Sequence, residues 1–320
     1  MDALIETFAT LQQTLFEAWV QPLVFGMGQG HLLDKAFEGA GWLVVGLLQI
    51  LILVLVIGPL QRLWPAEPVV FPKAIRVDVV YTLIHRLGLF KLVMFFSLDH
   101  AFEQGWGLLR AMGWPTFHLD ALWPGVTDQA LVSFVLYLVF FDFVHYWLHR
   151  AQHQSNTWWA LHSLHHSQRQ MTMWSDNRNH LLDDMVTSLI LSTVAVLLGV
   201  GPGQFVALVA ISQLSESFQH ANLRIGFGPW GERLWVSPRF HRRHHSIGFG
   251  HEFDLKGQKV LGGCNFGVLL PWWDVLFGTA DFQQRYDPTG VRDQVEQGRD
   301  YGDGFWAQQR QGWRRLWGRA

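Results

Sequence analysis

Histidine is the residue type that gives this chain its strongest chemical signal. The sequence holds 16 histidines, and 12 of them lie between His145 and His251. Neutral imidazole is a preferred ligand of Fe, Zn, Cu and Ni. Cys264 is the only cysteine, so neither an intramolecular disulfide nor a cysteine-based zinc or iron–sulfur site is expected. Any metal site in this chain is therefore predicted to be built from imidazoles.

Most of these histidines form three clusters with helical spacing. The first cluster has a spacing of four residues, and the other two follow the pattern i, i+3, i+4, so each would share one face of a helix. The clusters are His145, His149 and His153; His162, His165 and His166; and His241, His244 and His245. Two isolated histidines, His180 and His220, lie between the second and third clusters.

The clustered histidines are too many for a single metal ion. A structural zinc needs four ligands, and a catalytic zinc usually takes three and a water molecule. Eight to ten imidazoles therefore predict two metal ions. Ligating histidines usually donate their other N–H to a carboxylate or carbonyl. Among Asp142, Asp183, Glu216 and Asp274, the first and last are the favoured partners.

An isolated histidine is more often a surface or hydrogen-bonded residue than a ligand. That interpretation suits four histidines outside the clusters, and it suits His251 moderately well. The four are His31, His85, His100 and His118.

Four apolar stretches must position the clusters, and they predict helices embedded in a membrane. Residues 39–61 carry no charged side chain, and about 20 such residues cross a hydrocarbon core. Residues 78–98 and 129–148 predict two further spans, although both contain charged side chains. Residues 185–215 are also uncharged, but Gly199-Val-Gly-Pro-Gly203 interrupts them. They predict a helical hairpin that enters the membrane and returns on the same side.

Composition agrees with a membrane protein. Hydrophobic residues make up 49% of the chain and charged residues 16%, against roughly 25% charged in soluble proteins. The 17 tryptophans also fit, because Trp concentrates at membrane–water boundaries. A net charge of -2 argues against a nucleic-acid-binding protein.

Basic residues predict the orientation. Of 24 Lys and Arg, 22 lie in residues 61–100, 149–183 and 220–320, and positive loops prefer the cytoplasm. The N-terminus is then outside, and every histidine cluster lies on the cytoplasmic side of a bacterial inner membrane or an ER-type membrane.

Both ends of the chain carry amphipathic patterns. Ile5, Phe8, Leu11 and Leu15 share a helical face near the N-terminus. Near the C-terminus, Trp306, Trp313 and Trp317 share a face with arginines nearby. Each pattern predicts either a helix lying on the membrane or an ordinary helix packed on the domain. We therefore expect an N-terminal membrane region (1–125), a catalytic domain (126–280) and a polar C-terminal tail with an interfacial helix (281–320).

Residues 128–280 resemble the fatty acid hydroxylase superfamily, which includes sterol desaturases, sterol methyl oxidases, ceramide and carotenoid hydroxylases, and alkylglycerol monooxygenase. The resemblance is carried by motifs whose order and spacing are specific. They are D-x-x-x-Y-W-x-H-R-x-x-H (Asp142 to His153), H-x-x-H-H-S (His162 to Ser167), Gln219 to Asn222, P-x-x-H-x-x-H-H (Pro238 to His245), Asn265 to Gly267, and Trp273 to Thr279.

The resemblance implies an all-α, multi-pass membrane protein with a cytosolic, histidine-rich helical cap. It implies two iron ions that use O₂ to hydroxylate or desaturate a C–H bond of a sterol, fatty acyl, carotenoid or ether lipid. The implied ligands are His149, His153, His162, His165, His166, His180, His220, His241, His244 and His245. Relatives often carry Tyr at the position of His145, so this residue, like Asp142 and Asp274, is expected beside the ligands.

Around His180 the sequence departs from the family pattern, because Arg178-Asn-His-Leu-Leu-Asp183 replaces R-x-H-P-x-E. The chain shows no flavin, haem or iron–sulfur segment, so a separate electron-donor protein is expected.

Two other functions fit some of the same residues. A membrane zinc hydrolase would use histidine ligands, but the histidine count exceeds its need. A metal-binding or transport protein would line the bilayer midplane with its ligands, whereas nearly all of these histidines fall outside the apolar cores.

Overall fold

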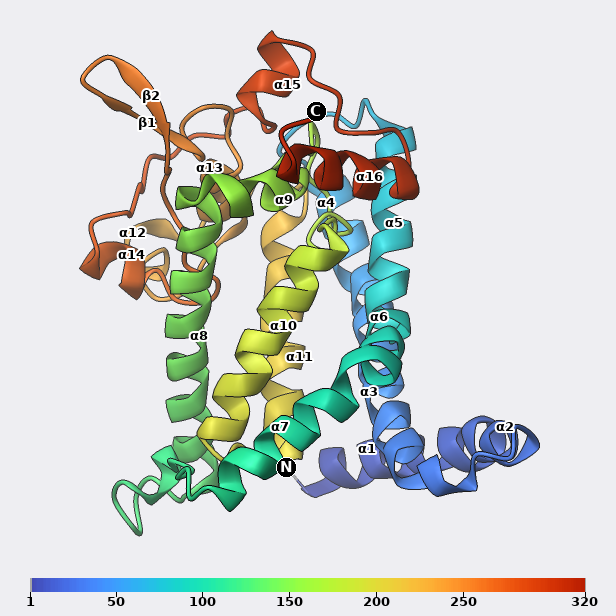
Figure 1. The fold of residues 1–320 in the computed structure, drawn as a ribbon. Helices are drawn as coiled ribbons and strands as arrows, with labels where there is room; N and C mark the ends of the chain where they lie inside the picture. Colours follow the sequence, from blue (N-terminus) through green and yellow to red (C-terminus); the bar gives the residue numbers. More distant parts are fainter. Residues whose placement is uncertain (1, 320) are drawn as a thin grey trace.

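The computed structural model describes residues 2–319, and nearly all of its regular structure is helical (Figure 1). The helices are α1 (Asp2–Leu15), α2 (Gln21–Gly26), α3 (Leu33–Ile52), α4 (Gly58–Leu63), α5 (Pro72–Arg86), α6 (Leu89–Met94), α7 (His100–Ala111), α8 (Ala130–Gln154), α9 (Asn156–His166), α10 (Leu181–Leu197), α11 (Pro202–His220), α12 (Gly228–Gly231), α13 (Pro238–His244), α14 (Trp272–Leu276), α15 (Arg292–Glu296) and α16 (Phe305–Leu316). Helical turns of other types join α1 to α2, α3 to α4, and α6 to α7.

One antiparallel hairpin of two strands, β1 (Glu252–Leu255) and β2 (Gln258–Leu261), departs from the all-α expectation. Its two-residue loop is Lys256-Gly257, and both residues have positive φ, 54° and 83°. Such a turn matches the twist of paired strands, and glycine adopts it without steric cost.

Two helices are long and apolar enough to cross a membrane. They are Gly30–Leu63, which contains the predicted 39–61 span, and Ala130–Gln154, which contains 129–148 almost entirely. The predicted 78–98 span falls on Pro72–Arg86 and Leu89–Ala111, which pass the same test as a pair bent by 54°. The bend lies at Gly88, whose φ of 77° ends the first helix of the pair. Residues 2–319 therefore contain two candidate spans, or three if the bent pair is counted.

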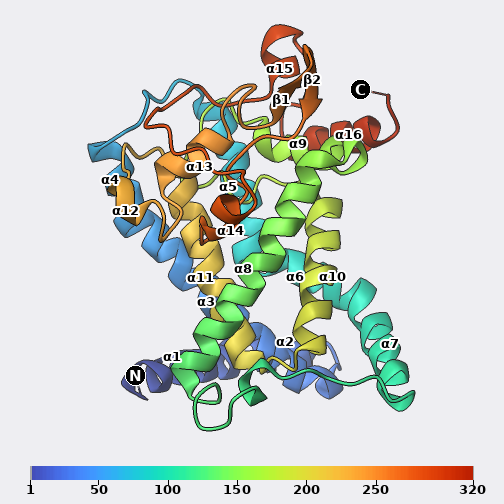
Figure 2. The same cartoon turned by 90° about the vertical axis from the view of Figure 1, so that its left-hand side faces the viewer.

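The predicted hairpin is formed by α10 and α11, which run beside α8 in both views (Figures 1 and 2). Its tip reaches the end of the bundle opposite the histidines, where the Tyr137 hydroxyl donates to the Leu198 carbonyl over 3.1 Å. Neither helix is among the candidate spans. Tyr137, Phe141, Ala195, Leu198 and Leu208 form a buried apolar cluster between the hairpin and α8.

The charge of Arg86, at the end of α5, is buried among polar partners. Its guanidinium donates to the Asp176 carboxylate over 2.8 Å, to Gln49 over 2.9 Å and to Ser217 over 3.0 Å. Charged groups in membrane helices are costly unless paired in this way. The pairing ties α3, α5 and α11 to the loop that precedes α10.

Short helices form a cap over one end of the bundle (Figure 2). Ser155 begins α9, since its hydroxyl accepts the Trp158 N–H, and Ser237 begins α13 by accepting the Phe240 N–H. Ser is a favoured residue at this position because it satisfies an unpaired backbone donor. The caps fix where α9 and α13 start, and so which way their histidines face.

Candidate metal centre

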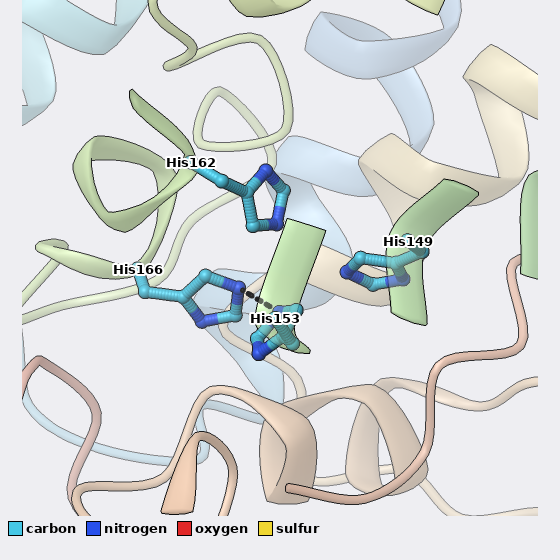
Figure 3. Close-up of side chains that lie close together, drawn as sticks. All are labelled: His149, His153, His162 and His166. Carbon is cyan, nitrogen blue, oxygen red and sulfur yellow. Dashed lines mark hydrogen bonds between the residues drawn. The ribbon is translucent and has the colours of Figure 1, made fainter. Parts of the chain in front are cut away.

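Nine buried imidazoles from four helical segments converge in the cap. Two groups of four have ligand nitrogens within 4.8 Å of one another, and a third group joins them. The groups are His149, His153, His162 and His166 (Figure 3); His165, His220, His241 and His245; and His166, His244 and His245. The rings of His166 and His245, one from each four-membered group, stack with their centroids 4.2 Å apart. The two groups are therefore neighbours.

Distances between ring nitrogens fit metal coordination. Two nitrogens that bind the same metal ion at about 2.1 Å lie about 3.0 Å apart when the N–metal–N angle is a right angle. They lie about 3.4 Å apart when that angle is tetrahedral. Nε2 of His153 lies 3.0 Å from Nε2 of His166, and the dashed line in Figure 3 joins this pair. In the other group, Nε2 of His220 lies 3.1 Å from Nε2 of both His165 and His241. The histidine clusters therefore fit a metal site.

The opposite ring nitrogen of four of these histidines is hydrogen-bonded, which fixes the ring orientation. Three donate Nδ1–H to main-chain carbonyls: His149 to Phe266 (2.9 Å), His220 to Glu216 (2.7 Å) and His244 to Cys264 (2.7 Å). His162 faces the Asp183 carboxylate at 3.0 Å. The tautomer with a proton on Nδ1 leaves the Nε2 lone pair free for a metal. Nε2 of His162 and of His244 are buried and lack any partner in the described chain.

Burial keeps these imidazoles uncharged. It lowers the pKa of His165, His166, His241, His244 and His245 well below 6.5, and neighbouring imidazoles lower it further. A metal ion needs neutral imidazole, so at neutral pH these ligands are ready to bind.

His180 is the one expected ligand that the structure does not bring into the cluster. Its Nε2 lies 2.9 Å from the Gln309 carbonyl, and its Nδ1 accepts the Leu182 N–H at the start of α10. Both ring nitrogens are thus engaged by the backbone. Nδ1 caps α10 and Nε2 contacts α16, so neither ring nitrogen is left for a metal.

His251, expected to lie outside the site, is instead packed against it. The residue is 2% exposed, its ring centroid lies 4.4 Å from that of His166, and its Nε2 has no partner among the described residues. Burial lowers its pKa to about 3. The β1–β2 hairpin, which begins at the next residue, holds it there. Proximity to the third cluster was its only signal in the sequence.

The acidic partners differ from those expected. Asp274 accepts the N–H groups of Phe266 and Gly267, so it positions His149 only through the Phe266 carbonyl. Asp142 accepts the N–H groups of Leu269 and Leu270 in the same loop. The carboxylate that meets a cluster imidazole directly belongs to Asp183.

His145 lies one helical turn before His149 on α8. In the part of the chain that the structure describes, it makes no hydrogen bond or ring contact with the nine clustered histidines.

Similar proteins match about half of this chain. Ornithine lipid hydroxylase OlsE from Rhizobium tropici is 31% identical over 53% of this chain and 47% of its own length. Alkylglycerol monooxygenase from Danio rerio is 27% identical, covering 52% of this chain and 33% of the relative. Delta(7)-sterol 5(6)-desaturase ERG3B from Gibberella zeae is 27% identical, covering 46% and 41%. This chain thus spans less than half the length of these relatives.

No solved structure matches the chain. The model of the fatty acid hydroxylase family matches residues 134–279. This range includes all nine clustered histidines and the motifs Asn265 to Gly267 and Trp273 to Thr279. Residues 134–279 therefore form a fatty acid hydroxylase domain.

Proposed function

We propose that this protein is a membrane-bound oxygenase that uses two iron ions and O₂ to hydroxylate or desaturate a C–H bond of a lipid. The observation that supports it most is the pair of adjacent four-imidazole groups in a fatty acid hydroxylase domain. The names of its relatives point to oxidation of ornithine lipids, alkylglycerols and sterols.

The two groups would hold one iron ion each, with His244 beside both. Bound iron would supply the redox chemistry that activates O₂, which imidazoles alone lack. The chain's own residues have three tasks. The Nε2 atoms would bind the iron ions. The carbonyls of Phe266, Glu216 and Cys264 hold the rings of His149, His220 and His244 in place. Burial keeps bulk water away from the site.

Long helices of the bundle lead to the site. His149 and His153 lie in the last turns of α8, and His220 ends α11. The apolar cluster of Tyr137 and its neighbours lies lower on the same helices. A lipid chain moving along these helices from the bilayer would meet the metals at their ends. Electrons would come from a separate donor protein.

Comparative lipid mass spectrometry tests the reaction. Cells with the protein should contain a lipid that differs from one in cells without it by a gained oxygen atom or two lost hydrogen atoms. The difference identifies both the substrate and the type of oxidation. Identical lipid profiles under aerobic conditions would count against the proposal.

Substitutions test the site in the same assay. His165→Ala and His244→Ala each remove a buried imidazole from the cluster, so lipid oxidation should be abolished and bound iron reduced. His118→Ala is the matched control, because His118 lies at the far end of the bundle beside the hairpin tip and is half exposed. Near-normal oxidation in either cluster variant would contradict the assignment. Zinc as the bound metal, with hydrolysis and no oxidation, would favour a hydrolase.

A further inference from the structure

The C-terminal helix α16 lies outside the range matched by the family, which ends at residue 279. It lies across the histidine end of the bundle, beside α9 (Figures 1 and 2). It packs mainly on α9, which directly follows the candidate span α8. The helix therefore lies at one end of the candidate spans.

Its inner face is fixed to the protein by polar contacts. The Gln309 carbonyl faces His180, and the Gln309 side chain donates to the Tyr81 hydroxyl over 2.9 Å and accepts the Leu181 N–H over 2.9 Å. Arg315 donates to the Ala160 carbonyl of α9 over 3.0 Å. Because the inner face of α16 is held at Gln309 and at Arg315, the helix presents its opposite face in a defined direction.

That opposite face consists of tryptophan and arginine. The exposed positions within α16 are Trp306, Arg310, Trp313 and Arg314, and exposed Trp317 follows directly. Trp306 is 78% exposed and Trp317 64%. Residues 304–319 contain no acidic side chain. The face is therefore both apolar and positively charged.

We propose that this Trp–Arg face of α16 binds the headgroup region of a bilayer that contains anionic phospholipids. Tryptophan prefers this region because its ring has an apolar body and a polar N–H. Arginine is attracted to anionic headgroups, and amphipathic helices that lie in the interface carry both residue types. An acidic protein would match the charge, but it would not account for three exposed Trp rings on a helix at the end of the candidate spans.

Lipid binding by this face would also support the metal centre. The inner face of α16 holds α9, which carries His162, His165 and His166, and it holds His180 at the start of the hairpin. Contact with the bilayer would thereby brace the helix that bears a third of the clustered imidazoles.

A fluorescent label on the outer face tests the proposal in the full-length protein and does not depend on the reaction. On a Cys264→Ser background, Trp313→Cys carries an environment-sensitive dye in nanodiscs of phosphatidylcholine, with or without phosphatidylglycerol. Lys256→Cys, at the exposed hairpin tip, is the matched control site. With anionic lipid, brominated lipid should quench the dye at position 313, and acrylamide should reach it poorly. The dye at position 256 should show the reverse.

Charge is tested by substituting Gln for Arg310 and Arg314 of the face and for Arg319, an exposed residue just beyond the end of α16. The ratio of lipid-contacting to water-exposed label should fall about five-fold for each Arg removed, from about 1 kcal/mol per basic residue near an anionic surface. Lys at the same positions should restore it, and Arg285→Gln, at an exposed cap position, should have no effect. Equal acrylamide access at positions 313 and 256 in both lipid mixtures would overturn the proposal. So would protection that appears only when an acidic soluble protein is added.

Discussion

At the scale of single residues, both ring nitrogens of His180 have backbone partners, so this imidazole has a structural role. Its Nδ1 caps α10 and its Nε2 faces the Gln309 carbonyl of α16. Gly312 leaves room for the ring, since a Cβ there would lie 2.3 Å from the His180 Cδ2 atom. We therefore expect His180→Ala to retain bound iron but to loosen α16.

Iron content per protein and protease sensitivity of the C-terminal segment measure the two effects. His162→Ala is the comparison, because its Nε2 is one of the buried nitrogens without a partner. That variant should lose iron while α16 stays protected. An equal loss of iron from both variants would place His180 among the ligands after all.

The site could be predicted from the sequence only where local spacing determines position. The i, i+3, i+4 patterns placed His162, His165 and His166 on one helical face, and that face is buried in the cap. Spacing could not show which direction the isolated His180 faces. It also could not place His251, because a strand hairpin rather than a helix brings this residue to the cluster.

At the scale of elements, the close approach of α3 and α5 depends on a glycine. A Cβ on Gly46 would lie 1.7 Å from the Arg86 carbonyl oxygen, a main-chain atom that cannot rotate away. Gly46→Ala must therefore separate the two helices and disturb the polar partners of Arg86. We expect it to lower the free energy of unfolding by about 1–3 kcal/mol or more, as overpacking usually does.

Thermal unfolding of the full-length protein in nanodiscs measures this loss. Gly39→Ala, on the same helix, is the matched control because no atom lies within 4 Å of its added Cβ. It should leave the melting temperature unchanged or raise it slightly, since Ala favours helix. Similar melting temperatures for the two variants would show that the helices separate at little cost.

Elements were predictable where composition alone defines them. The uncharged run of 39–61 is enough to predict a span. The helix itself, Gly30–Leu63, begins nine residues earlier, because a helix can continue through charged residues that the uncharged run excludes. The sequence did not predict the β1–β2 turn, because Lys256 adopts a positive φ, which is uncommon for residues other than glycine.

At the scale of the whole molecule, acid should destabilise the metal-free protein. Buried imidazoles whose pKa lies well below 6.5 bind fewer protons in the folded chain than in the unfolded chain. Stability is then complete above about pH 6.5 and falls as pH falls towards the folded pKa values, by up to about 1.4 kcal/mol per pH unit for each imidazole.

Thermal unfolding of chelator-treated protein across this pH range tests the slope. His100→Ala, which removes an exposed histidine, should leave it unchanged. Removing a clustered histidine should reduce it. A melting temperature that does not change between about pH 7 and about pH 5 would contradict the burial of neutral imidazoles.

The clustered histidines are also separated in the order of synthesis. The ribosome adds His149 first and His245 96 residues later. At roughly 5–20 residues per second, about 5–20 s separate the two, and the α10–α11 hairpin is synthesised in between. During that interval α8 and α9 already carry all four imidazoles of the first group, whereas His165 is the one member of the second group on these helices. The second group can therefore assemble only after α11 and α13 have been made.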